Sequence, residues 1–300
     1  MKIAIAGGNG FIGKAMCQLF LEQRCQVYIL TRRPERLLPQ PGVTYVSWMH
    51  EGDQPEQELE GVDAIINLAG LSLNSGRWTA ARKAALLESR LATTKEIIRM
   101  IKALKQPPSV LLNASAVGYY GISRDRTFTE QDVVEPTDFL SLVVHQWEQE
   151  ALKSGIRTVL MRLGVVLGAD EGAFPKMMLP YKLFVGGKLG SGEQPLSWIH
   201  VEDAARAAYH CMMTPSIQGA VNFTAPEPVT MGQFGQAIAA QMHRPHYFPV
   251  PGAVLKLALG EMSLLLLEGQ RVMPEKLLAN EYSFQYPTVA EAIKQLLDKR

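Results

Sequence analysis

Residues 2–13 read Lys2-Ile-Ala-Ile-Ala-Gly-Gly-Asn-Gly-Phe-Ile-Gly13, and this stretch decides the fold. The apolar run up to Ala6 is typical of a strand that is buried on both faces. Glycines follow it, and then apolar residues recur at helical spacing as far as Phe20. The sequence therefore predicts a strand, a tight turn and a helix in immediate succession.

The glycines of this turn have the spacing of a dinucleotide-binding loop. Gly7, Gly10 and Gly13 lack Cβ atoms, so the backbone there can turn sharply, lie against a pyrophosphate and pack the helix closely on the sheet. The helix N-terminus adds free N–H groups and a partial positive charge. Glycines also serve ordinary structural turns. The second strand expected at Gln26–Leu30 supplies the context that favours dinucleotide binding.

The residues after this second strand indicate which dinucleotide is bound. A strand end at this place meets the adenosine ribose, where an acidic residue accepts from the 2′-OH of NAD and an arginine pairs with the 2′-phosphate of NADP. Thr31, Arg32 and Arg33 stand there, and no acidic residue appears before Glu35. The alternative is that both arginines are solvated loop charges. With the glycine loop beside them, they predict NADP(H).

Strand and helix patterns alternate along most of the chain. Apolar runs predict further strands, and amphipathic stretches predict helices at Thr79 to about Leu104 and at Asp138–Leu152. The further strands lie at Val43–Ser47, Val62–Gly70, Ser109–Ser115 and Thr158–Val166. This rhythm predicts an α/β fold with a doubly wound parallel sheet, the Rossmann architecture. We expect residues 1–218 to form the NADP(H)-binding domain, with substrate-side loops from about 172, and residues 219–300 to form a small, mainly helical domain.

Composition narrows the classes of partner. Thirty basic and twenty-nine acidic residues leave a formal charge of +1, which gives no reason to expect nucleic acid or an anionic membrane. No apolar stretch is long enough to span a membrane, and no targeting segment precedes the first strand. The three cysteines form no C-x-x-C pair, and the six histidines show no metal-ligand spacing. We expect a cytoplasmic protein without a metal whose partner is a small molecule.

Candidate catalytic residues follow the strand expected at Ser109–Ser115. Ligands of open α/β sheets bind at the carboxyl ends of the strands, where Ser115, Tyr119 and Tyr120 stand. We take Ser115 and Tyr119 as the catalytic candidates. The alternative for a tyrosine here is a packed ring whose hydroxyl donates to a backbone carbonyl.

Several motifs, in this order, carry a resemblance that covers nearly the whole chain. They are Gly7 to Gly13, Asn67 to Gly70, Arg77 to Thr79, Ser89-Arg90 with Thr93-Thr94, Ser115 to Gly121, Trp147-Glu148, Arg162 to Gly168, Trp198 to Asp203, Asn222 to Pro226, Glu261, Gly269 to Arg271, and Pro274. The chain resembles the extended short-chain dehydrogenase/reductase superfamily, and more closely its atypical epimerase-like branch, the 39U subfamily. The last four motifs are similar to a small domain of unknown function that this branch carries.

The resemblance implies a set of cofactor-binding residues. Around the pyrophosphate it implies Gly7, Asn9, Gly10, Phe11, Ile12 and Gly13. It implies Thr31 and Arg32 at the 2′-phosphate, and Leu68 and Ala69 at the adenosine half. It also implies that Arg90, where extended members carry an asparagine, reaches a phosphate or the nicotinamide ribose, and that the backbone of Val166 touches the nicotinamide end.

The chain departs from the superfamily at its usual acid/base pair. Members that move hydride use Tyr-x-x-x-Lys, in which the lysine tunes the tyrosine. No tyrosine here has a lysine four residues later. The pair belongs within residues 138–144, and there the positions of the tyrosine and of the lysine both hold apolar residues in either plausible register. Two classes of function remain open. One is an NADP(H)-dependent oxidoreductase or epimerase acting on a hydroxylated or carbonyl compound, and the other is a non-catalytic NADP(H)-binding redox sensor. An ordinary sugar-nucleotide epimerase is disfavoured by the missing pair.

The last third of the chain is expected to face the substrate. Apolar helices are predicted at Met231–Gln241 and Gly252–Leu267, and they must pack on the loops beyond the strand ends or on another chain, as in a homodimer. We expect them to form the wall of the crevice opposite the sheet. Trp198, His200 and the glycines of 186–192 would then line the seam, the alternative being a plain surface loop.

Overall fold

A computed structural model describes residues 1–299, and its centre is a seven-stranded parallel sheet. The strands are β1 (Lys2–Ala6), β2 (Gln26–Thr31), β3 (Val43–Ser47), β4 (Ala64–Asn67), β5 (Val110–Ala116), β7 (Arg157–Leu163) and β11 (Gly219–Phe223). Their order is β11-β7-β5-β4-β1-β2-β3, so the chain winds outward from β1 in both directions. This confirms the predicted doubly wound Rossmann architecture.

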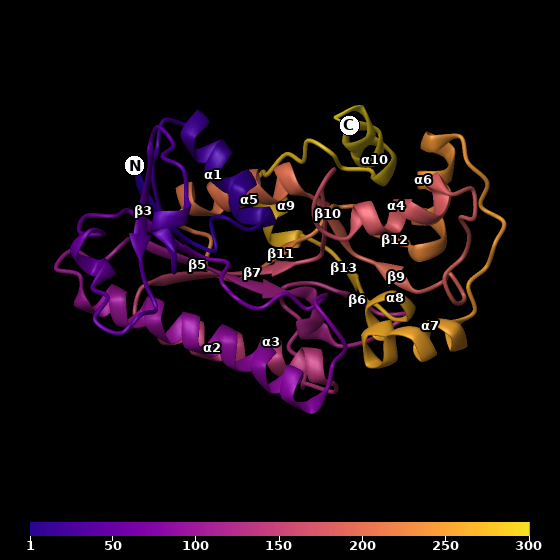
Figure 1. The fold of residues 1–300 in the computed structure, drawn as a ribbon, viewed down its shortest axis with the longest axis horizontal. Helices are drawn as coiled ribbons and strands as arrows, with labels where there is room; N and C mark the ends of the chain where they lie inside the picture. The colour runs from indigo at the N-terminus through magenta and orange to yellow at the C-terminus, as the bar shows by residue number, and fades with distance from the viewer. Residues whose placement is uncertain (300) are drawn as a thin grey trace.

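Helices cover both faces of the sheet (Figure 1). On one face lie α1 (Phe11–Glu22) and α5 (Val201–Met213), and on the other lie α2 (Ala80–Ala103) and α3 (Phe139–Ala151). Alternate residues of β1 enter separate cores: Ile3 and Ile5 pack with α1 and α5, whereas Ala4 and Ala6 pack with α2. Burial on both faces explains why the strands read as continuous apolar runs.

The strand β11 is the difference between the predicted and the observed sheet. Six strands are predicted, but Gly219–Phe223 adds a seventh that pairs in parallel with β7. The predicted boundary between residues 218 and 219 therefore falls directly before a strand of the Rossmann sheet. Gly219 and Asn222 interrupt the apolar pattern of this segment, and β11 is fixed by the backbone groups that the edge of β7 offers.

The predicted strand Thr158–Val166 is divided in the structure. β7 ends at Leu163, and β8 (Val165–Leu167) leaves the main sheet to pair with β10 (Trp198–His200). Gly164 sits at the break, where a Cβ atom would lie 2.6 Å from the carbonyl oxygen of Ser197. A glycine is required here because another chain segment crosses this backbone closely.

A second core lies beyond the carboxyl ends of the strands. It is built around α4 (Phe174–Lys182), α6 (Met231–Met242) and α10 (Val289–Asp298), with the short pair of β9 (Pro195–Leu196) and β12 (Val229–Thr230). The predicted helix at 252–267 is present as α7 (Gly252–Leu259), the 3₁₀ turn η5 (Gly260–Ser263) and α8 (Leu264–Leu267). Figure 1 shows α7 and α8 at the lower right, apart from α6 and α10.

The chain then returns to the first core. β13 (Arg271–Val272) pairs with β6 (Thr127–Phe128), and α9 (Glu275–Ala279) packs on β11. The hydroxyl of Tyr282 donates to the carboxylate of Asp203 on α5. The end of the chain thus belongs to both cores.

Trp198 and His200 do not line a seam, as the sequence led us to expect. Both are fully buried on β10. The indole N–H of Trp198 donates to the carbonyl oxygen of Glu227, and the His200 ring bonds Gln295 of α10. They join the second core to the sheet instead, because β10 is covered on both sides.

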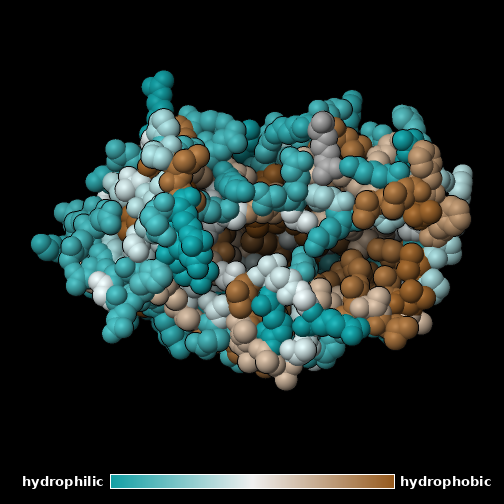
Figure 2. Space-filling view, viewed as in Figure 1, coloured by the Kyte–Doolittle hydropathy of each residue, from teal (hydrophilic) through white to brown (hydrophobic). Residues whose placement is uncertain are grey.

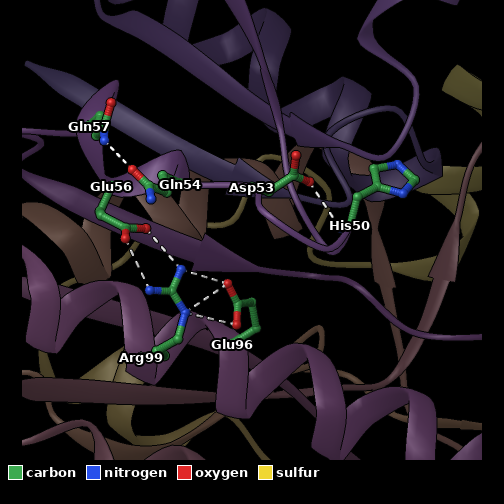
Figure 3. A network of polar contacts seen from close by, with 7 residues as sticks. All are labelled: His50, Asp53, Gln54, Glu56, Gln57, Glu96 and Arg99. Carbon is green, nitrogen blue, oxygen red and sulfur yellow. Dashed lines mark hydrogen bonds and ion pairs between the residues drawn. The ribbon is translucent and has the colours of Figure 1, made fainter.

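An ion-pair network joins the C-terminal part of α2 to the segment before β4 (Figure 3). Arg99 donates to both carboxylate oxygens of Glu56 on the 3₁₀ turn η2 (Pro55–Gln57), and also to Glu96. Within residues 1–299, no helix combines the length and the apolar character that crossing a bilayer requires.

Candidate functional site

The glycine loop between β1 and α1 is compressed against its neighbours. Gly7 has φ +82°, and a Cβ atom there would lie 3.0 Å from the backbone of Leu68. The amide of Gly10 donates to the carbonyl oxygen of Gly7 at 3.0 Å, which closes the turn. Only glycine adopts this conformation at this distance from another backbone without strain.

Gly13 marks the close contact between helix and strand. A Cβ atom on it would lie 2.2 Å from the carbonyl oxygen of Gly7. The helix α1 begins at Phe11 after Gly10, which offers no side chain as a cap, and its first turn holds no acidic residue. Its first N–H groups are therefore left for a ligand, and anions bind at such helix N-termini. The loop fits a pyrophosphate.

The other residues of the loop present backbone or open side chains. Asn9 is exposed at the tip, and Ile12 is half-buried against the first core. The Phe11 ring packs on Gly168 and Gly172, where Cβ atoms would lie 2.3 and 2.8 Å from ring carbons. Phe11 therefore anchors the loop after β8 to the start of α1.

The end of β2 holds two arginines with free guanidinium groups. Arg32 and Arg33 are exposed, and neither side chain has a hydrogen-bond or ion-pair partner in the described part of the chain. The backbone beneath them is fixed: the hydroxyl of Thr31 accepts from the amide of Arg33 at 3.3 Å, and His50 donates to the carbonyl oxygen of Arg32. Two cations on a fixed backbone suit a phosphate group.

Buried amides hold the end of β4 in place. Asn67 donates to Thr94 at 3.1 Å and to the side chain of Asn113 at 2.7 Å, and its oxygen accepts from the amide of Ala69 at 3.2 Å. The adjoining backbone of Leu68 lies against Gly7. Leu68 and Ala69 are thus positioned beside the glycine loop, where the sequence places the adenosine half of the cofactor.

Arg90 is a half-buried cation without a carboxylate partner within residues 1–299. Its side chain lies over Gly70 and 5.2 Å from the Trp147 ring, and it donates to the carbonyl oxygen of Leu86. Burial and, to a smaller extent, the nearby charge of Arg82 together lower the pKa of Arg90 to about 10. A buried positive charge with no counter-ion favours an anionic ligand at this place.

Val166 lies on β8, past the end of β7, and pairs in register with Ile199 of β10. It is half-buried and packs against the first core. The segment after β8 is held to α1 by an ion pair between Lys14 and Glu171 at 2.7 Å. Val166 therefore faces the same edge of the sheet as the glycine loop.

A buried polar network joins the carboxyl ends of β5, β7 and β11. Arg162 donates through Nε and Nη2 to the two oxygens of Glu148, each at 2.8 Å. Ser115 donates to the same carboxylate. Arg162 also donates to the hydroxyl of Tyr120, which donates onward to Asn222 at 2.8 Å. Burial raises the pKa of Tyr120 to about 12, so this hydroxyl stays protonated at neutral pH.

This network contains residues to which the sequence analysis assigned no role. Glu148 and Arg162 appear there only as parts of motifs. Their signal was an acidic residue beside Trp147 in an apolar helix, and an arginine inside an apolar strand. Charged residues in such places are almost always paired, but the sequence does not say with which partner.

The ring of Tyr119 contacts this network, but its hydroxyl makes no hydrogen bond with the network. Its ring is stacked on His145 with centroids 4.0 Å apart, and the Arg162 guanidinium carbon lies 3.3 Å from its centroid on another side. Its hydroxyl has no hydrogen-bond partner among residues 1–299, and the residue as a whole is 9% exposed. The structure therefore fixes the ring of Tyr119 and leaves its hydroxyl free, whereas Ser115 is engaged and only 2% exposed.

Comparison with known families covers nearly the whole chain. Residues 3–222 match the model described as the NAD dependent epimerase/dehydratase family. Residues 250–296 match a domain of unknown function, DUF1731.

Individual relatives agree with these matches. The chain is 47% identical to the epimerase family protein YfhF of Bacillus subtilis, over all of this chain and 99% of that protein. It is similar in structure to the human epimerase family protein SDR39U1, crystallised with NADPH, with a TM-score of 0.89 and 32% identity over the full length of both chains. A nucleoside-diphosphate sugar epimerase from Corynebacterium glutamicum gives a TM-score of 0.77 at 28% identity, over all of this chain and 59% of that one.

Proposed function

The chain belongs to the NAD dependent epimerase/dehydratase family, and we propose that it is an epimerase-like oxidoreductase that uses NADP(H). Family and fold support a nicotinamide dinucleotide as the cofactor. The observation that carries the choice of NADP(H) is the pair of unpartnered arginines, Arg32 and Arg33, on the fixed backbone after β2. The substrate is a hydroxylated or carbonyl small molecule.

The cofactor would be held by the residues that the sequence analysis selects. The uncapped start of α1 receives the pyrophosphate, and a Cβ atom at Gly13 would fill that space. Thr31 with Arg32 and Arg33 would receive the 2′-phosphate, and Leu68 and Ala69 would face the adenosine half. Arg90 would reach a phosphate or the nicotinamide ribose, and Val166 would face the nicotinamide end. When bound, the nicotinamide supplies hydride transfer.

Tyr119 is the group that we assign to proton exchange with the substrate. Its hydroxyl is free, and its ring is held between His145 and Arg162. A donor whose position is fixed in advance loses little freedom when it acts. Ser115 stays a predicted catalytic residue, but its hydroxyl donates to Glu148, so its first role is to hold that carboxylate.

A second candidate is a redox sensor that binds NADP(H) without turnover. The observation that favours it is the engagement of Ser115 with Glu148, together with the absence of a Tyr-x-x-x-Lys pair. Of the two predicted catalytic hydroxyls, only that of Tyr119 is then free to contact a substrate, which leaves few groups for catalysis.

Cofactor choice is tested by titration with NADPH and NADH. A charge-assisted contact contributes about 1.5 to 3 kcal/mol, which is roughly ten- to a hundredfold in affinity. Arg32→Ala should lose about that much affinity for NADPH and little for NADH. The matched control is Arg24→Ala, because Arg24 is also exposed but precedes β2 at the opposite edge of the sheet. Equal affinities for both cofactors in the unmodified protein would contradict the choice of NADP(H).

Turnover is tested by NADPH oxidation with a panel of aldehydes and ketones. An enzyme should consume NADPH with at least one of them, and Tyr119→Phe should lower that rate while leaving NADPH affinity unchanged. The control is Tyr209→Phe on α5, whose half-buried ring lies against Phe20. NADPH binding without consumption across the panel would support the sensor instead.

A further inference from the structure

Beyond the strand ends, several large apolar side chains are exposed together (Figure 2). In the view of Figure 2, apolar residues gather over α7 and α8 and border a hollow near the middle of this face. We call the following residues the apolar patch: Leu183, Phe184, Val185, Tyr247, Phe248, Val254 and Leu257. Such a patch on one face of a protein marks a binding surface.

The patch is built from segments that hold one another. The amides of Tyr247 and Phe248 both donate to the carbonyl oxygen of Gly186, and the amide of Gly190 donates to the carbonyl oxygen of Val250. The chain continues directly from there into α7. The segment 183–190, the segment 247–250 and α7 therefore form one surface.

The helix α7 has an apolar sequence but no buried residue. Leu257 is 82% exposed and Val254 is 54% exposed. Polar contacts hold the helix in place: Arg77 donates to the carbonyl oxygens of Leu257 and Ala258, at 2.8 and 3.2 Å. Lys83 of α2 pairs with Glu261 just beyond α7. These contacts fix its backbone and leave its apolar side chains uncovered.

The inner end of the patch reaches the cofactor side of the molecule. Arg77 belongs to the segment after β4, and Arg90 lies over Gly70 of the same segment. In the described chain, Arg77, Arg82 and Arg90 have no carboxylate partner, and the Nε of Arg82 is buried without any partner. The surface is thus cationic where it meets the cofactor side and apolar farther out.

We propose that the substrate is a small molecule with an anionic group and a long hydrocarbon chain, the chain lying on the apolar patch. This deepens the proposed function and rests on it. The anionic group meets Arg77 and Arg82, which donate to backbone carbonyls and a serine but to no carboxylate within residues 1–299. The hydrocarbon covers Val254 and Leu257. A second copy of this protein would also cover the patch, but it gives no role to the unpaired cations at the inner end. One amphipathic molecule accounts for both features.

The test uses straight-chain carboxylates of four, eight and twelve carbons as probes, titrated by calorimetry into the NADPH-loaded protein. Affinity should rise with length, by up to about fourfold for each methylene that is fully buried. Leu257→Ser should weaken this dependence on length. Leu38→Ser is the matched control, since Leu38 is 86% exposed and lies outside the patch, and it should behave as the unmodified protein does. Both leucines are so exposed that neither change threatens folding.

Three results would overturn the inference. One is affinity that does not depend on chain length, and another is equal behaviour of Leu257→Ser and Leu38→Ser. The third is another occupant of the patch, seen either as a dimer in sedimentation that Leu257→Ser converts to a monomer or as cosedimentation with phospholipid vesicles that the same variant abolishes. NADPH affinity is measured on the same samples. If the protein does not bind NADPH, the proposed function is refuted. If it binds NADPH but fails the carboxylate tests, only the inferred substrate class is refuted.

Discussion

Two arginine–carboxylate pairs, each with two hydrogen bonds, lie in different regions of the molecule. At the strand ends, Arg162 binds both oxygens of Glu148 at 2.8 Å. On the outer side of α2, Arg99 binds both oxygens of Glu56 at 3.0 and 2.8 Å (Figure 3). The side chains of the first pair are each 5% exposed, whereas those of the second are 46% and 19% exposed.

The two pairs differ most in burial, and burial decides what each of them does. Burial alone would lower the pKa of Arg162, but the hydrogen bonds and charge of Glu148 raise it above the ordinary value, so the guanidinium stays charged in the buried site. The charges of the pair at Arg99 are hydrated in the unfolded chain and stay largely hydrated in the folded one, so the pair gains little stability on folding. Salt also screens its attraction. The buried pair therefore fixes the position of Ser115 and Tyr120, while the outer pair only fastens a loop.

The largest effect is expected from breaking the buried pair. Glu148→Gln leaves the Arg162 cation without a counter-ion, which costs about 3–5 kcal/mol of unfolding free energy. Urea unfolding measures it. Glu150→Gln is the control on the same helix, because Glu150 pairs with the exposed Lys153. A loss below about 1 kcal/mol for Glu148→Gln would remove the distinction between the two pairs.

Replacing both buried partners sharpens the same comparison. The double variant with Glu148→Leu and Arg162→Met has no unpaired buried charge. Its loss of unfolding free energy should therefore be smaller, by about 1–3 kcal/mol, than the sum of the losses in the two single variants. The measurement is a double-mutant cycle from urea unfolding. Additive losses would show that the two side chains act independently.

Breaking the outer pair should have a small effect. Arg99→Ala is expected to lower the unfolding free energy by about 0.2–1 kcal/mol, because an exposed ion pair is only slightly more stable than its two side chains hydrated separately. The difference should shrink further in 1 M salt, where the Debye length is about 3 Å. A loss that equals that of Glu148→Gln would contradict the role of burial.

The smallest effect is expected in the pH dependence of the outer pair. The hydrogen bond from Arg99 holds the pKa of Glu56 below its ordinary value, so the carboxylate stabilises the folded state above the unfolded pKa. That contribution is lost as pH falls through the folded pKa. The stability difference between the unmodified protein and Arg99→Ala should therefore decline from about pH 5 to pH 3. A difference that grows on acidification would reverse the sign and refute the assignment.

Local patterns predicted the sheet well, because each strand–turn–helix unit is specified within a short stretch. The first strand, the glycine loop and α1 depend on neighbours in sequence, and the structure has them where the sequence places them. β11 escaped prediction because its five residues gain their conformation from β7, more than fifty positions earlier. Trp198 and His200 were misplaced because glycine-rich loops gave no sign that β10 is covered on both sides.

The candidate site divides in the same way. The residues at the glycine loop and after β2 follow from local chemistry; in the structure they have open backbone or free side chains, and their contact with a cofactor stays a prediction. The partner of Ser115 could not be predicted, because Glu148 reaches it from another element. The free hydroxyl of Tyr119 and the engaged one of Tyr120 have the same sequence context, and only their three-dimensional neighbours distinguish them.

The return of the chain from the second core to the first has a consequence for its synthesis. Val272 completes the pairing of β6, and the carbonyl oxygen of Met273 accepts from the side chain of Asn222 on β11. On the ribosome, a growing polypeptide therefore holds β6 without its partner strand until this late segment has left the exit tunnel. Long-range pairing of this kind is slow and exposes apolar surface meanwhile. Translation that stalls before Met273 should yield nascent chains that depend on chaperones.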